Sequence, residues 1–246
     1  MNQTHPQTGQ QRPALVKWLG YLALTFLLAL PLAVLTVRSG AWQQGLLVYA
    51  VSCLAAVILL LLAIVLLLLP RFADWRKAIA GRAALTLPGA LLFLAVLGGG
   101  DVPPIHDIST DLQDPLVFTA APAQRGPDAN SLDTAPETVR QQREAYTDLK
   151  SLQSTQSYDE VFDAAVQAGT TMGWDIYLQD RNAGIIEAVA TTAIMGFKDD
   201  VIVRVRTNAQ GTVVDMRSVS RVGRSDMGAN AKRIRAYQQA LRDLRI

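Results

Sequence analysis

Two patterns of apolar positions divide the chain near residue 100. In the first part, residues 18–37, 45–69 and 83–98 form three apolar runs with few polar residues. A helix needs roughly 20 apolar residues to cross the hydrocarbon of a bilayer. The pattern therefore predicts a transmembrane region over residues 1–100 with about three helices.

The number of crossings depends on the third run. A cleaved signal peptide is the competing interpretation of the first run, but the second run follows at once and favours a multi-pass anchor. The third run is shorter and contains Pro88 and Gly89. Two interpretations stay open for it, a third span or a re-entrant segment.

Cations in the short loops predict an orientation. The loop between the first two runs holds only Arg38, whereas the loop before the third run holds Arg71, Arg76, Lys77 and Arg82. Because cations concentrate on the cytoplasmic side, we expect a cytoplasmic N-terminus. Three spans would then place residues 101–246 outside the inner (plasma) membrane of a bacterium, in the periplasm. Two spans would leave them in the cytoplasm.

Composition limits the partners. The formal net charge is +2, and residues 101–246 contain 16 basic against 20 acidic side chains. Since no global basic field results, nucleic acid is not an expected partner, whereas a lipid bilayer is. The single cysteine, Cys53, cannot form an intramolecular disulfide.

The second part begins with a stretch that has neither hydrophobic period. Residues 101–140 are rich in Pro, Ala and Asp, which predicts an extended tether, with a short helix from about Glu137 to Tyr146. Helical spacing follows over 158–172, with Ser157 and Glu160 placed as a capping box. A last amphipathic helix is predicted over 227–244, with Asp226 or Ser225 at its start.

Four segments between these two helices alternate with the period of a strand. They predict a four-stranded antiparallel meander with two helices on one face, an α+β two-layer sandwich over residues 141–246. The residues expected on the helix-covered face are Trp174, Ile176, Leu178, Ile186, Ala188, Ala190, Val201, Val203, Val205, Val214, Met216, Ser218 and Ser220.

The opposite face of this sheet is expected to show a ladder of opposite charges. Two arrangements stay open, because the acidic tether can fold over this face or a partner protein or lipid headgroup can bind it. The expected side chains are Asp175, Tyr177, Gln179, Glu187, Arg204, Arg206, Asp215, Arg217 and Arg221.

The C-terminal sequence resembles the DUF1499 family of bacterial and plastid proteins. The similar block runs through "GFKDDVIVRVR" and "MRSVSRVGRSDMGANAKRIR", and "PPIHDISTD" at 103–111 is similar too. The resemblance covers about residues 101–246 and implies a fold unit and a cell-envelope setting, without an activity. The matching residues are Phe197, Asp199, Asp200, Arg204, Arg217, Ser218, Ser220, Arg221, Gly223, Ser225, Asp226, Gly228, Asn230, Arg233 and Ile234.

The same block supplies the candidate site, an anion-binding corner where the last strand meets the last helix. Unpaired N–H groups at a helix start attract anions, and guanidinium groups bind their oxygens in pairs. The candidate ligand-binding residues are Arg204, Arg217, Arg221, Arg224, Asn230 and Arg233. In the alternative interpretation these arginines form structural ion pairs with Asp199, Asp200, Asp215 and Asp226.

The interpretation of the protein as an enzyme is less favoured. A metal-dependent hydrolase would use His106, Asp107 and Asp111, which stand in an irregular segment. No nucleophile elbow, P-loop or dinucleotide motif occurs in the sequence, and no cofactor is expected. The sequence therefore predicts a membrane-anchored binding module for an anionic ligand or lipid headgroup, with a scaffold for envelope proteins as the alternative.

Overall fold

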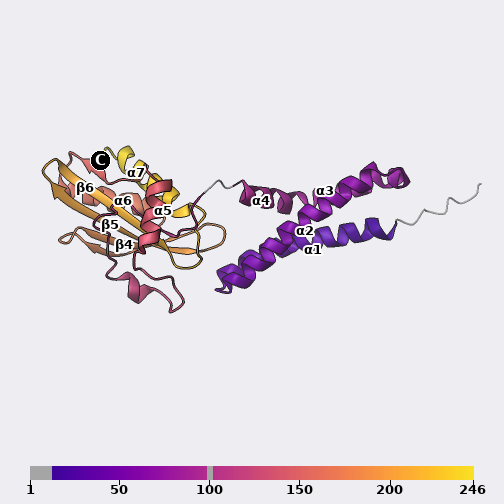
Figure 1. Cartoon of the computed structure of the whole chain (residues 1–246), viewed down its shortest axis with the longest axis horizontal. Helices are drawn as coiled ribbons and strands as arrows, with labels where there is room; N and C mark the ends of the chain where they lie inside the picture. The colour runs from indigo at the N-terminus through magenta and orange to yellow at the C-terminus, as the bar shows by residue number, and fades with distance from the viewer. Residues whose placement is uncertain (1–12, 99–101) are drawn as a thin grey trace, which may run out of the picture. The chain divides into compact units, whose positions relative to one another are not determined.

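The computed structural model describes residues 13–98 and 102–246 (Figure 1). They belong to two compact units, Met1–Gly100 and Asp101–Ile246. The division falls where the hydrophobic pattern changes, so each unit has its own core.

The first unit is helical. Helices α1, Ala14–Arg38, and α2, Trp42–Leu68, are both long and apolar enough to cross a membrane. After a short 3₁₀ helix, Pro70–Trp75, helices α3, Arg76–Ala84, and α4, Leu87–Leu97, follow. The helical stretch Pro70–Ala84 meets α4 at a bend of 52°, so a third crossing exists only if this bent pair forms one span. The third span remains a prediction.

Small residues let the helices of the first unit approach closely. A Cβ atom at Gly45 in α2 would lie 2.5 Å from Val37 Cγ2 and 2.8 Å from the carbonyl oxygen of Ala33 in α1. A Cβ atom at Gly89 in α4 would lie 2.7 Å from that of Ala56. Close contact through small residues with large apolar side chains on the outside is typical of helices packed in a bilayer. The outward side chains include Leu28, Leu32, Leu35, Leu61 and Leu68.

The second unit contains one antiparallel sheet of six strands in the order β1-β6-β5-β4-β3, with β2 also paired to β6. The predicted four-stranded meander is therefore only part of the sheet. The two additional strands are three residues long, too short to show a period. The strands are β1 Asp107–Ser109, β2 Leu152–Ser154, β3 Asp175–Asp180, β4 Ile185–Thr191, β5 Lys198–Asn208 and β6 Gly211–Ser220.

Helices α6, Tyr158–Thr171, and α7, Ala229–Asp243, pack on one face of this sheet and enclose the main core. The capping box of Ser157 and Glu160 at the start of α6 is confirmed. A third helix, α5, Pro136–Ala145, adds to the two in the predicted sandwich and is tied to β1 by Gln142, whose side chain bonds both backbone groups of Ser109.

The side chains expected on the helix-covered face lie in this core with few exceptions. Leu178 does not join it, because the pairing of β3 with β4 shifts register between Ile176 and Leu178. A bulge of this kind turns the following residues away from the face that alternation predicts.

The opposite face of the sheet is covered by the chain itself. The segment 110–134 lies over it and forms a second core of Leu116, Phe118 and Ala121 with Ile202 and Val219. Glu187 is fully buried there and accepts the backbone N–H groups of residues 119–121. Of the two arrangements left open by the sequence, the intramolecular one is observed. Much of the expected tether is thus a folded cover, which we call the cover segment.

Candidate functional site

Three arginines of the block that resembles the family, Arg217, Arg221 and Arg233, bind buried carboxylates inside the domain. Arg217 lies under the cover segment, with 2% of its surface exposed, and binds Asp107 with Nε to Oδ1 at 2.9 Å and Nη2 to Oδ2 at 2.7 Å. Two more N–H groups, on Nη1 and Nη2, donate to the carbonyl oxygens of Leu116 and Leu132 at 2.7 and 2.6 Å. Four of the five N–H donors of this guanidinium are therefore used inside the domain.

Arg221 has the same relation to Asp200. Its Nη2 lies 2.7 Å from Oδ1 of this fully buried carboxylate, and Nη1 donates to the carbonyl oxygen of Gln124 at 2.9 Å. Arg125 of the cover segment reaches the same carboxylate, with Nε 2.9 Å from Oδ2. Asp200 therefore holds the cover segment and the end of β6 together.

Arg233 and Asn230 join α7 to β6. Arg233 pairs with Asp199 and donates to Ser218 Oγ at 2.9 Å, while Ser218 donates to Asn230 Oδ1 at 2.7 Å. The amide of Asn230 donates to Ser220 Oγ and to the carbonyl oxygen of His106, both at 2.9 Å. These polar groups fix the first turn of α7 on the sheet.

The start of α7 is occupied by a side chain of the protein. Asp226 accepts the N–H groups of Gly228 and Asn230 at 2.7 and 2.9 Å. Burial raises the pKa of Asp226, although these N–H groups oppose the rise. Asp226 thus differs from the ion-pair partner expected from the sequence, because its partners are backbone groups. Arg224 is exposed and forms no ion pair with any described residue.

A further cluster lies at the side of the sheet where β5 and β6 meet the cover segment. The buried carboxylate of Asp215 accepts from Arg206 Nε at 3.0 Å, from Arg204 Nη2 at 3.3 Å and from Ser151 Oγ. Arg204 continues to Asp111 at 3.1 Å and Asp114 at 2.7 Å. Burial of Asp111 is outweighed by the N–H groups of the following turn and by both guanidiniums, which hold its pKa below the usual range.

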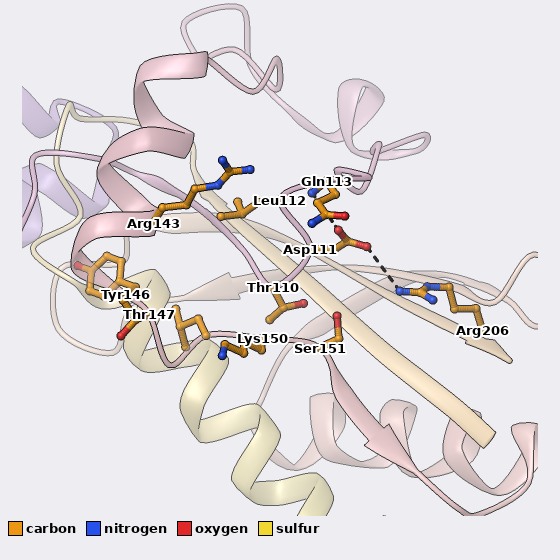
Figure 2. A pocket seen from close by; sticks show the side chains of 11 residues that line it. Thr110, Asp111, Leu112, Gln113, Arg143, Tyr146, Thr147, Lys150, Ser151 and Arg206 are labelled. Carbon is orange, nitrogen blue, oxygen red and sulfur yellow. Dashed lines mark hydrogen bonds and ion pairs between the residues drawn. The ribbon is translucent and has the colours of Figure 1, made fainter. Parts of the chain in front are cut away.

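This cluster forms one wall of an open pocket of about 800 Å³ (Figure 2). The pocket lies between α5, the turn after β1 and the loop before β2, and its volume is in the range of ordinary ligand pockets. Figure 2 shows Thr110, Asp111 and Arg206 on one side and Arg143, Tyr146 and Thr147 on the other. The remaining lining residues are Leu112, Gln113, Leu149, Lys150 and Ser151.

Two cations of this pocket differ from the other basic residues near it. Arg143 and Lys150 are exposed, and no described carboxylate pairs with either of them. Arg206, by contrast, is bound to Asp215, and Arg140, which also lies on α5, is bound to Glu137 and Glu144. The pocket therefore has two charges available to a ligand, and Thr147 also lines it.

The residues considered for a metal do not come together as a site. Asp107 is bound to Arg217 and Asp111 to Arg204, while His106 contributes its backbone oxygen to Asn230. Within residues 13–98 and 102–246, no group of three or more His, Cys, Asp and Glu side chains could hold a metal ion.

The pocket was not predicted from the sequence. Ser151, Lys150 and Arg143 lie outside the family-like block and show no motif, so only their position against β6 brings them together. For the cover segment, by contrast, Glu187 gave a signal in the sequence, because a carboxylate in the middle of an apolar strand needs a partner.

The second unit is a small α+β domain, preceded in the chain by two helices that could anchor it in a membrane. The chain belongs to the DUF1499 family. The family model, described as "Protein of unknown function (DUF1499)", matches residues 107–241, more than half of the chain. The match confirms the resemblance, and it begins at Asp107 in β1, so the family unit includes the cover segment. No curated protein matches the chain.

Proposed function

We propose that this protein is a membrane-anchored binding protein whose DUF1499 domain holds an anionic, polar ligand in the pocket of Figure 2. The observation that carries the proposal is the pair of cations without carboxylate partners, Arg143 and Lys150, on the rim of a cavity of about 800 Å³. Phosphate and carboxylate groups are the anions that such side chains bind.

The strand-to-helix corner is less suited to this role than the pocket. At the corner, Arg217, Arg221 and Arg233 are bound to buried carboxylates, and Asp226 fills the helix start. A ligand there would have to separate ion pairs inside the domain, and a buried charge left without its partner costs about 3–5 kcal/mol. The pocket demands no such exchange, because its two cations are exposed.

The lining of the pocket favours binding over chemistry. Ser151 is the only lining hydroxyl with a carboxylate partner, Asp215, and the lining residues include no histidine or cysteine. Asp215 also accepts from two arginines, so its oxygens are engaged in hydrogen bonds within the domain. We therefore assign the pocket a ligand-holding role.

Calorimetry with two probe anions tests the proposal, using the purified full chain in detergent. Pyrophosphate represents phosphate ligands, and citrate represents carboxylate ligands. We expect binding of at least one probe, weakened about tenfold by Arg143→Ala or Lys150→Ala, since each removes a charged hydrogen-bond donor. Arg140→Ala is the matched control, because Arg140 lies on the same helix but is already paired.

Two results would overturn the assignment. One is the failure of both probes to bind the wild-type chain. The other is binding that survives the double change Arg143→Ala and Lys150→Ala as well as it survives Arg140→Ala. Hydrogen exchange over α5 would show in the same samples that the helix stays folded.

We also propose that the domain lies in the periplasm of a bacterium, anchored in the inner membrane. The cations Arg71, Arg76, Lys77 and Arg82 lie in the first part of the bent helix pair and support a cytoplasmic end for it, and the apolar part that follows would complete the third crossing. A phosphatase fused after Ile246 should be active, and a fluorescent protein that folds only in the cytoplasm should stay dark. The opposite pair of results would place the domain in the cytoplasm.

A further inference from the structure

Three segments leave the sheet at the same end. The turn 192–197 joins β4 to β5, the loop 221–228 follows β6, and residues 102–106 lead into β1. Their common position follows from the register, in which Thr191 pairs with Lys198, Asp199 with Ser220, and Asp107 with Val219. Two backbone bonds tie them together, from Arg221 N to Lys198 O and from Asp226 N to Ile105 O, each 3.1 Å long. We call this end of the domain the tip.

The tip exposes large apolar side chains. Ile194 in the turn is 71% exposed, and Met227 in the loop is 56% exposed. Among the described residues of the second unit, the only other large hydrophobic side chain in this class is Val117 of the cover segment. Met227 also has a φ of 51°, a conformation that is costly for a side chain with a Cβ atom. The fold therefore holds an apolar side chain outward at a cost in backbone energy.

The charge around these side chains is positive. Lys198 and Arg224 are exposed at the tip and have no carboxylate partner among the described residues. The carboxylates nearest to them in sequence are already bound: Asp199 and Asp200 pair with Arg233 and Arg221. Asp226, in the loop of the tip, accepts the backbone N–H groups of Gly228 and Asn230. Apolar side chains flanked by cations are the pattern that binds the interface of a bilayer with anionic lipid.

A short stretch of chain connects the tip to helix α4. Val102 lies against the loop of the tip, 3.5 Å from the position that a Cβ atom at Gly228 would take. Helix α4 ends at Leu97, which leaves four residues between the apolar helix and Val102. Five residue steps span at most about 18 Å. A tether this short gives even a weak contact a high effective concentration.

We infer that the tip docks on the surface of the bilayer in which the chain is anchored. The contact is made through Ile194 and Met227, with Lys198 and Arg224 beside them. The occupant of this apolar surface is thus lipid with anionic headgroups. The pocket of Figure 2 is not part of the tip, so this inference is independent of the ligand proposal.

Spin labels on the full chain in lipid nanodiscs of phosphatidylcholine and phosphatidylglycerol test the docking. In a Cys53→Ser background, a nitroxide is attached at Ile194→Cys or Met227→Cys. We expect collisions with oxygen to rise and collisions with a water-soluble nickel chelate to fall, both relative to a label at Gln210→Cys. Gln210 is the matched control, because it is exposed in the β5–β6 turn at the other end of the sheet.

The accessibilities of the two labels test whether the tip docks on lipid. If both report the same accessibility as the Gln210 label, the tip is in water and the inference is overturned. If they become immobile but stay inaccessible to oxygen, a protein surface or a second copy covers them, and lipid docking is overturned as well. Reversal of charge by Lys198→Glu with Arg224→Glu should shift both labels towards the accessibility of Gln210, while Arg140→Glu should not.

Discussion

Arg217 in β6 and Asp107 in β1 form a doubly hydrogen-bonded ion pair inside the domain, 110 residues apart in sequence. The pair is 2% and 6% exposed, and the ring of Phe118 lies 5.5 Å from the guanidinium carbon. Because Arg217 also binds two carbonyl oxygens of the cover segment, it connects the sheet to the residues that enclose its second face.

Removal of one partner of this pair should destabilise the domain strongly. For Arg217→Met we expect a loss of about 3–5 kcal/mol, since Asp107 would stay buried without its counter-ion. The free energy of opening of β6, measured by hydrogen exchange in the full chain, checks this. Asp107→Leu combined with Arg217→Met should lose less than Arg217→Met alone. If the double variant loses as much stability as Arg217→Met or more, the unpaired charge of Asp107 does not cause the loss.

The main core could be predicted from the sequence, because strand alternation and helical spacing leave a direct trace in the order of apolar residues. Val201, Val203 and Val205 lie in that core as expected. The cover segment could not be predicted, because it is irregular and is held by hydrogen bonds to side chains that are distant in sequence, such as Glu187 and Arg217. Three-residue strands such as β2 carry no period either.

At the strand-to-helix corner the sequence predicted the type of interaction but not all of the partners. Ion pairs of the arginines with Asp199, Asp200 and Asp215 were foreseen as one of two interpretations, but the partners from the cover segment, such as Arg125, were not. A charge in a sequence shows that a partner is needed and not which residue supplies it. The pocket depends on the path of the chain from α5 to β2, which local patterns do not specify.

Glu187 should control the closure of the cover segment. It accepts the N–H groups of Thr119 and Ala121 at 2.6 and 2.7 Å, with that of Ala120 between them. In Glu187→Ala these donors lose their acceptor, at roughly 1–3 kcal/mol each. We expect faster hydrogen exchange over residues 116–124 and faster cleavage by trypsin after Arg125. Glu144→Ala, which removes an exposed glutamate bound to Arg140, should change neither rate.

Asp226 should make the stability of α7 depend on pH. Burial raises its pKa above the ordinary 3.8, so the folded chain binds the proton more tightly than the unfolded chain does. Its contribution to stability is therefore fully present below the unfolded pKa and is lost as the pH rises through the folded pKa. Asp226→Asn removes this dependence. As the pH rises from the unfolded pKa through the folded pKa, the variant should gain stability relative to wild type, measured as the opening of α7. If the difference in stability between Asp226→Asn and wild type does not change with pH, the raised pKa of Asp226 is contradicted.

Two glycines with similar backbone angles should respond differently to alanine. Gly184 and Gly173 have φ values of 71° and 74°, so a side chain is strained at either position, by about 1–2 kcal/mol. At Gly184 a Cβ atom would also lie 2.1 Å from the carbonyl oxygen of Val205, whereas at Gly173 it would meet nothing within 4 Å. Because Val205 N donates to Gly184 O at 2.8 Å, the backbone of β5 cannot move away without loss of this bond. Gly184→Ala should therefore lower the free energy of unfolding well beyond Gly173→Ala, and equal losses would show that β5 yields to the added methyl group.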